Sequence, residues 1–235
     1  MGMKTRVVSS AAAIAATLTL GVALAGPAAA DTIDLEVDYT ANTSTVIKKL
    51  NQKVEFPATP LVTTLSLDYP SLEKGTLSGK LNLPTTSTDL KLGPLNLATI
   101  TMSIVDPSEV TGTATIDMET FDVSLKAQQS FKIKIDSIQP LGISTGSANL
   151  NLLLPNANCV TSVTTANLSG TANLNEGLDT VLSGSYEIPA FTGCGNLVGP
   201  VLNALVSGPG NTLTVDLKTN TDGAATSMLR QAATS

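Results

Sequence analysis

The stretch Thr32-Ile33-Asp34-Leu35-Glu36-Val37-Asp38-Tyr39 decides the fold class. Apolar side chains occupy every second position, and acidic side chains or threonine occupy the positions between them. Successive side chains of a β-strand point to opposite faces, so this alternation predicts a strand with one buried face and one face in water.

The same alternation recurs along the chain. Turn-forming pairs such as Asp106-Pro107, Gln139-Pro140 and Pro155-Asn156 separate the alternating segments. Short strands with regular punctuation are typical of an antiparallel sandwich or a closed antiparallel sheet, and we predict an all-β antiparallel β-sandwich. The further strands are expected over 76–83, 98–105, 110–118, 121–125, 131–135, 147–153, 161–174, 179–188 and 212–217.

We assign residues 31–218 to this β-sandwich domain and residues 219–235 to a flexible polar tail. The tripeptide Leu-Ser-Gly occurs in three alternating segments, at 77–79, 168–170 and 182–184. Such strings are common in β proteins rich in serine and glycine. The alternative is two packed β units, with a subdivision near 140–155.

A short helix near the C-terminus interrupts the β pattern. Between Asn196 and Ser207, apolar residues recur at spacings of three and four, which predicts a short amphipathic helix. Either Asn196 caps its start, or Gly199 caps it and Pro200 takes the first helical position. Residues 208–210, Gly-Pro-Gly, are expected to end it.

The chain contains two cysteines, Cys159 and Cys194. An even number of cysteines in an exported chain usually forms disulfides, so we predict that these two pair. Two free thiols or a metal site are the alternatives, and two cysteines without histidine cannot complete a usual zinc shell. The disulfide would hold the start of the helix against the strand near Cys159.

The first 30 residues are typical of a cleavable signal peptide. Lys4 and Arg6 precede an apolar stretch over 11–25, and small residues lead to a predicted cleavage between Ala30 and Asp31. About fifteen apolar residues are short for a membrane span, which needs roughly 20; an uncleaved anchor is the rival interpretation. No later stretch is long and apolar enough to cross a bilayer as a helix, so we expect no transmembrane segment after cleavage. The predicted location is secreted, extracellular or cell-surface associated.

The charge balance restricts the partners. The chain carries 13 basic and 19 acidic residues, and the signal peptide contains two of the basic ones, so 11 and 19 remain and the net charge becomes −8. An acidic protein is a poor electrostatic match for nucleic acid or for an anionic membrane surface. We therefore expect no nucleic-acid partner, and consider cell-wall or envelope components, or a lipid.

The chemistry that the chain lacks argues against an enzyme. It has no histidine, so Ser-His-Asp and Cys-His nucleophile pairs are impossible. Carboxylate pairs remain, because two acids suffice for glycoside hydrolysis; Asp117 with Glu119 is one candidate, and Asp34, Glu36 and Asp38 are another. The last three share the polar face of one strand, as solvated residues do. We assign no catalytic, cofactor-binding or metal-binding residue and predict a non-enzyme without cofactors.

Two segments carry a resemblance. Phe191-Thr192-Gly193-Cys194-Gly195 and Gly208-Pro209-Gly210-Asn211-Thr212-Leu213 resemble secreted two-cysteine β-domain proteins of actinobacteria that have no assigned function. The resemblance covers 159–217 and implies a source and a compartment, not an activity. In this sequence both segments have structural roles: Gly193 and Gly195 suit a tight turn into the helix, and 208–211 suits a turn into the last strand.

Two functions fit these observations. The first is a non-enzymatic, secreted or envelope-associated structural or interaction protein. The alternative is a carrier of an apolar ligand such as an envelope lipid, because an aliphatic β interior with few aromatic residues can leave a cavity. A continuous apolar cavity above roughly 300 Å³ favours the carrier, whereas a packed interior favours the first function.

Overall fold

A computed structural model describes residues 32–141 and 150–220. The predicted signal peptide, its cleavage between Ala30 and Asp31, the tail beyond 220 and residues 142–149 of the proposed subdivision lie outside the described residues.

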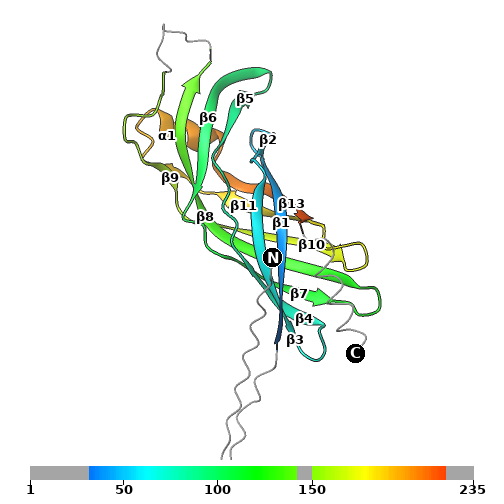
Figure 1. Cartoon of the computed structure of the whole chain (residues 1–235). Coiled ribbons are helices and arrows are strands. Elements are labelled where there is room, and N and C mark those ends of the chain that lie inside the picture. The colour runs from blue at the N-terminus through cyan, green and yellow to red at the C-terminus, as the bar shows by residue number, and fades with distance from the viewer. Residues whose placement is uncertain (1–31, 142–149, 221–235) are drawn as a thin grey trace, which may run out of the picture. The chain divides into compact units, whose positions relative to one another are not determined.

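The described residues form thirteen strands and one short helix, and every pair of neighbouring strands runs antiparallel (Figure 1). This confirms the predicted all-β antiparallel class with one short helix near the C-terminus. The elements are β1 (Thr32–Ile47), β2 (Gln52–Glu55), β3 (Thr59–Asp68), β4 (Lys74–Gly79), β5 (Thr86–Leu92), β6 (Leu95–Val105), β7 (Val110–Ile116), β8 (Asp122–Pro140), β9 (Cys159–Thr161), β10 (Thr164–Asn173), β11 (Thr180–Ile188), β12 (Phe191–Thr192), α1 (Val198–Leu205) and β13 (Gly208–Thr219).

Eight strands form a closed ring, and the two layers of the sandwich are its opposite walls. The pairing order is β10-β11-β13-β1-β3-β4-β7-β8, and β8 also pairs with β10, which closes the path. The closing pair runs in continuous register from Thr164 opposite Phe131 to Asn173 opposite Asp122. The three ring strands after residue 155 are neighbours of one another, and so are the five that precede it; the two groups join at β1 with β13 and at β8 with β10, so both belong to one hydrogen-bonded path.

Alternation puts aliphatic side chains inside the ring. On β1 the buried residues occupy every second position from Leu35 to Ile47. Glycine makes room between the neighbouring strands β10 and β11: Ser169 pairs with Ser183, which sets Leu182 against Gly170 and Leu168 against Gly184. Two copies of the Leu-Ser-Gly tripeptide thus face each other and pack a leucine onto a glycine.

β8 joins the ring to a second sheet. Its first part pairs with β7 and β10, and its later part, from Lys132 onward, pairs with β6 and β9. β5 extends this second sheet beyond β6, and β12 extends it beyond β9. The segments 121–125 and 131–135, predicted as two strands, are parts of this one long strand.

The other predicted strands match in part. Those over 98–105, 110–118, 179–188 and 212–217 coincide with β6, β7, β11 and β13 to within a few residues. The strand expected over 147–153 is wrong in its described part, because residues 150–153 form a loop. Sequence analysis missed β2, β3, β5 and β12: threonine and proline interrupt the alternation in β3, threonine does so in β5, and β2 and β12 have only four and two residues.

The helix is present but shorter than predicted. It begins after Leu197, so neither Asn196 nor Gly199 is the cap, and no side chain caps it. Pro200 lies at the third helical position rather than the first, where its missing N–H is still one that the helix leaves unpaired. The helix ends at Leu205, before Gly208, which instead opens β13.

Candidate functional site

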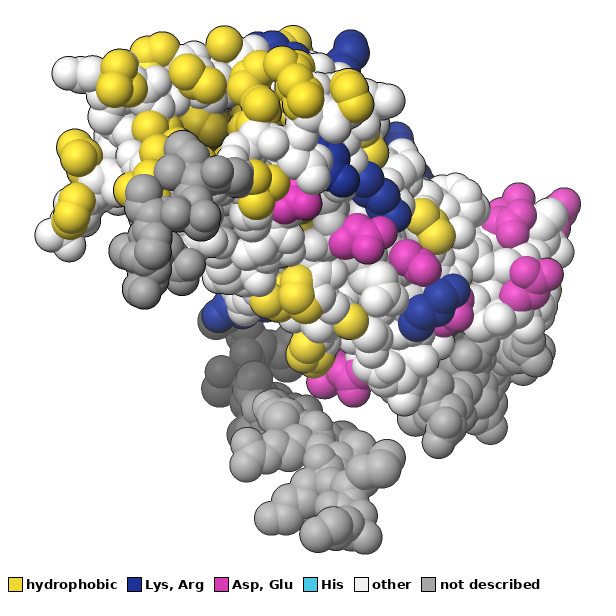
Figure 2. All heavy atoms as spheres, turned by 90° about the horizontal axis from the view of Figure 1, so that it is seen from above, with side chains coloured by type: hydrophobic (Ala, Val, Ile, Leu, Met, Phe, Trp, Pro, Cys, Tyr) yellow, Lys and Arg dark blue, Asp and Glu magenta, His cyan; other side chains and the backbone are white. Residues whose placement is uncertain are grey.

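Exposed aliphatic side chains gather at the end of the molecule that carries the second sheet and α1. Figure 2 shows hydrophobic side chains over this end, with most acidic side chains lying away from them. We call this surface the apolar end. Nine exposed large hydrophobic residues define it: Leu92, Leu95, Leu97, Leu141, Leu150, Leu152, Leu154, Leu197 and Val201.

The turn between β5 and β6 supplies the first part. Leu92 and Leu95 pair across this turn and are 50% and 63% exposed. The chain between them turns through Gly93 and Pro94. Leu97 follows, and its carbonyl accepts the N–H of Leu141 at 3.2 Å, which places the end of β8 beside the same turn.

The loop over 150–154 supplies the second part. The side-chain oxygen of Asn151 accepts the N–H groups of Ile138 and Leu153, which fastens the loop to the end of β8. This arrangement buries Leu153 but turns Leu152 and Leu154 outward. Local hydrogen bonding, rather than a lack of core space, therefore keeps these leucines in water.

Helix α1 supplies the third part. Its sequence contains no charged residue, and Leu202 packs inward while Leu197, Pro200, Val201 and Ala204 face outward. The spacing of these outward residues gives the helix an exposed apolar stripe. Soluble surface helices usually present polar residues to water, so a helix that is apolar on its outward face as well as its inward one is unusual.

The disulfide and a side-chain network hold the helix in place. Cys159 and Cys194 are bonded, as predicted, with their Cα atoms 4.3 Å apart, and the bond ties the approach to α1 to β9. Asn203 bonds the backbone of Phe191 twice, accepting its N–H and donating to its carbonyl. Gly193 and Gly195 adopt positive φ angles of 73° and 87°, which confirms the predicted tight turn on either side of the cysteine.

A groove runs between α1 and the loop that follows Leu154. Its volume is about 670 Å³, and one wall is the segment 154–157 while the other runs from Gly195 to Asn203. The disulfide and Phe191 form its floor. The groove continues the apolar end between two of its exposed leucines, Leu154 and Leu197.

The apolar end has its own charge pattern. The sequence contains no acidic residue between Asp89 and Asp106, between Asp136 and Glu176, or between Glu187 and Asp216, and these intervals contain all nine residues of the apolar end. Its lysines are Lys91 on β5 together with Lys48 and Lys49 in the turn after β1. The lysine pair lies beside the helix, since Lys49 donates to the carbonyls of Asn203 and Ala204 at its C-terminal end. None of the ion pairs formed by the described residues includes these three lysines.

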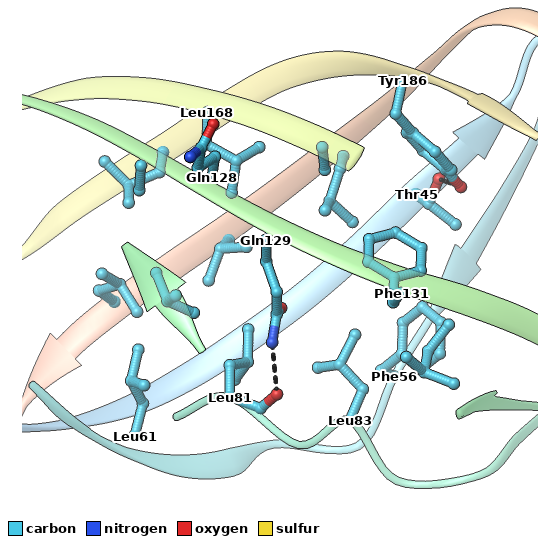
Figure 3. A pocket seen from close by; sticks show the side chains of 18 residues that line it. Thr45, Phe56, Leu61, Leu81, Leu83, Gln128, Gln129, Phe131, Leu168 and Tyr186 are labelled. Atoms are coloured by element: carbon cyan, nitrogen blue, oxygen red, sulfur yellow. Dashed lines mark hydrogen bonds between the residues drawn. The ribbon is translucent and has the colours of Figure 1, made fainter. Parts of the chain in front are cut away.

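The ring interior is the second candidate, because a carrier needs a cavity there. Its lining is almost wholly aliphatic and aromatic, with Phe56 and Phe131 on one side and Leu61, Leu81 and others around them (Figure 3). The cavity volume is about 50 Å³, far below the roughly 300 Å³ that a small-molecule site needs. The aliphatic residues predicted to fill a core do so.

Most polar groups inside the ring are paired, although the buried hydroxyl of Thr43 has no hydrogen-bond partner among the described residues. Thr45 and Tyr186 share a hydrogen bond of 2.8 Å, and Gln129 donates to the carbonyl of Leu81 across the cavity (Figure 3). Burial raises the pKa of Tyr186, although its bond to Thr45 opposes the rise. Burial, together with the nearby charge of Asp179, raises the pKa of Tyr39 to about 12. Both phenols thus contribute neutral hydroxyl groups to the ring.

None of the candidate carboxylates lines the ring interior or the groove beside α1. Asp34, Glu36 and Asp38 lie on the exposed face of β1, as their alternation indicated. Asp117 accepts the N–H groups of Glu119 and Thr120, and these bonds lower its pKa. Asp117 therefore stabilises the turn between β7 and β8.

Metal-binding clusters and membrane-spanning helices are both absent from the described residues. They contain no group of three or more His, Cys, Asp or Glu side chains that could hold a metal ion. In the same part of the chain, no helix has the length and apolar character needed to cross a membrane.

Comparison of the chain with protein-family models, with curated proteins and with solved structures found no match. The resemblance to actinobacterial secreted proteins stays a prediction. The apolar end was missed by sequence analysis, although one signal was present: its leucines lie in or beside turns and loops, many of them next to Gly, Pro or Asn, in long intervals without acidic residues.

Proposed function

We propose that this protein is a non-enzymatic interaction protein of the cell envelope, exported and then retained at a surface by its apolar end. The single observation that supports this function is the set of nine exposed Leu and Val side chains gathered around α1 and its groove. Many exposed apolar side chains gathered on one end of a protein are a feature of interaction sites. The disulfide agrees with an oxidising compartment outside the cytoplasm.

The carrier of an apolar ligand receives less support. A ligand enclosed by the ring would have to displace packed side chains, because the cavity there is only about 50 Å³. The larger groove beside α1 lies on the surface and suits docking better than enclosure of a whole lipid.

Fractionation of the producing cells tests the proposal. We expect the processed protein in the envelope fraction or loosely held at the surface, and we expect the variant Leu95→Ser/Leu197→Ser to be released into the medium. The matched control is Val62→Ser/Val181→Ser, whose residues are 49% and 51% exposed on the outer face of the ring. Equal retention of both variants, or an unprocessed protein in the cytoplasmic membrane, would overturn the proposal.

A further inference from the structure

We infer that the partner of the apolar end is a lipid bilayer surface, into which its leucines insert at the level where headgroups meet acyl chains. This inference rests on the proposed function and specifies the partner of the same site. Three observations favour a lipid surface over a protein: the shape of the apolar end, its residue types and its charge.

The shape is a set of separate projections. The most exposed residues are Leu197, Leu154 and Leu95, at 86%, 68% and 63%, and each comes from a different segment. A rigid protein partner would need a matching pocket for each projection, because protein interfaces pack as densely as protein interiors. A lipid surface needs no such match, since fluid acyl chains adapt to the side chains that enter them.

The residue types point the same way. Hot spots between proteins are enriched in Trp, Tyr and Arg, whereas Leu and Val are under-represented in them. The apolar end contains eight leucines and one valine and no aromatic residue. Leucine is among the most favourable side chains inside a bilayer, so this composition suits hydrocarbon.

The charge distribution orients the protein. The net charge of the whole protein argues against binding to an anionic membrane. That total, however, combines two ends of the molecule that differ in their charged residues. The apolar end has no acidic residue in its segments and carries Lys48, Lys49 and Lys91 outside any described ion pair. Lysines at this level attract anionic headgroups, and most acidic side chains lie away from the apolar end (Figure 2).

A second copy of the chain fits this surface less well. A symmetric dimer places the same patch of both copies face to face. Such a contact would bring the two sets of lysines together with no acidic residue in the segments of the apolar end to pair with them, and like charges across an interface disfavour association.

Vesicle flotation tests the inference, with the processed protein purified after export. We expect it to float with vesicles of phosphatidylcholine, and more completely when phosphatidylglycerol is added. Leu95→Ser/Leu197→Ser should weaken partitioning at least about tenfold on both vesicles, because it removes two of the most exposed apolar side chains. Val62→Ser/Val181→Ser should bind like the wild type. Far-ultraviolet circular dichroism and the Tm of each variant confirm that it is folded.

A second pair of variants isolates the lysines. Lys48→Gln/Lys91→Gln should lower binding to vesicles with phosphatidylglycerol by several-fold and leave binding to phosphatidylcholine unchanged, and added salt should remove the difference. The control Lys53→Gln/Lys132→Gln makes the same change in net charge at lysines that are paired with Glu55 and Asp106. Equal losses from both pairs would overturn the local role of Lys48 and Lys91.

The outcomes separate this inference from the proposed function. Wild-type protein that floats with neither vesicle overturns the lipid surface as partner. If such protein sediments as a dimer and Leu95→Ser/Leu197→Ser makes it a monomer, the occupant is a second copy. If it is still retained in the envelope through these leucines but does not dimerise, the partner is a wall component or a protein. The proposed function is overturned as well only if retention of the protein in cells does not depend on these leucines.

Discussion

The closed ring and the apolar end use the same aliphatic side chains in opposite ways. In the ring, Leu182 lies against Gly170 and is 4% exposed, whereas Leu197 at the apolar end is 86% exposed. The ring closes through continuous strand pairing, while the apolar end is built from a turn, a loop, an eight-residue helix and strands of two and three residues. The ring strands thus bury the aliphatic side chains of their inward face, whereas the turn, the loop and the outward face of the helix leave theirs exposed.

The ring and the apolar end are also stabilised by different interactions. Every ring strand has hydrogen-bonded neighbours on both sides, so most of its backbone groups can pair with backbone groups of those neighbours. The apolar end depends on the Cys159–Cys194 bond and on side chains such as Asn151 and Asn203 that bond backbone groups. Changes in the two regions should therefore have different effects, and the following predictions compare them.

Loss of the disulfide should have the largest effect on stability. In the loop-entropy model, a bond that closes a 35-residue separation stabilises the fold by about 3–4 kcal/mol. We expect Cys159→Ala/Cys194→Ala to lower the free energy of unfolding in urea by that amount. Hydrogen exchange should rise first in β9, β12 and α1, with wild-type protein under oxidising conditions as the reference. If hydrogen exchange rises equally in the ring strands and in β9, β12 and α1, the disulfide does not stabilise the apolar end more than the ring.

A side chain at Gly184 should have the next largest effect, and it acts on the ring. A Cβ there would overlap the carbonyl oxygen of Asn167 on the neighbouring strand. We expect Gly184→Ala to cost about 2–3 kcal/mol, as forced contacts in a packed core do. The control is Gly199→Ala in α1, whose Cβ would meet its nearest neighbour at 3.8 Å and which should stabilise the helix by up to about 1 kcal/mol. If urea unfolding shows comparable losses in the free energy of unfolding for Gly184→Ala and Gly199→Ala, the ring and the apolar end do not differ in how tightly they pack.

The ring was the more predictable region for a physical reason. Period-2 alternation over 32–39 identifies a strand because a half-buried strand must alternate. Ring closure was not predictable, since the pairing of β8 with β10 depends on contacts between distant segments. The continuity of β8 was hidden for the same reason: two alternating segments flank Gln128-Gln129-Ser130, and only the partners on each side make them one strand.

The apolar end was less predictable because its residues follow no single period. The disulfide followed from cysteine count and compartment, and the helix from spacings of three and four. The direction of Leu152 and Leu154 depends on the bonds of Asn151 to Ile138 and Leu153, which no sequence pattern specifies. The sequence does show where acidic residues are absent, and that property identified the surface once the fold was known.

Alkaline pH should weaken the ring by an amount on the order of 2 kcal/mol. The pKa of Tyr39 is about 12 in the folded ring, through burial and then the charge of Asp179, while an unfolded tyrosine ionises near 10. Between these pH values the folded state binds the extra proton, so stability is complete below about pH 10 and falls as pH rises toward 12. Urea unfolding from pH 9 to pH 12 should show a shallower fall for Tyr39→Phe than for the wild type. If the free energy of unfolding falls equally with pH in Tyr39→Phe and in the wild type, the raised pKa of Tyr39 does not weaken the ring.

Removal of an exposed leucine should have the smallest effect on stability, and it completes the comparison. Leu197 is 86% exposed, so its side chain gains little burial on folding, and we expect Leu197→Ala to change the free energy of unfolding by less than about 0.5 kcal/mol. The matched control is Leu202→Ala in the same helix, where a leucine that is 2% exposed should cost about 2–5 kcal/mol. A loss above about 1 kcal/mol for Leu197→Ala would mean that the isolated chain already covers this side chain. A near-zero change combined with weaker binding to vesicles would assign Leu197 to the partner, because a residue that contributes nothing to folding yet is needed for binding acts only at the contact surface.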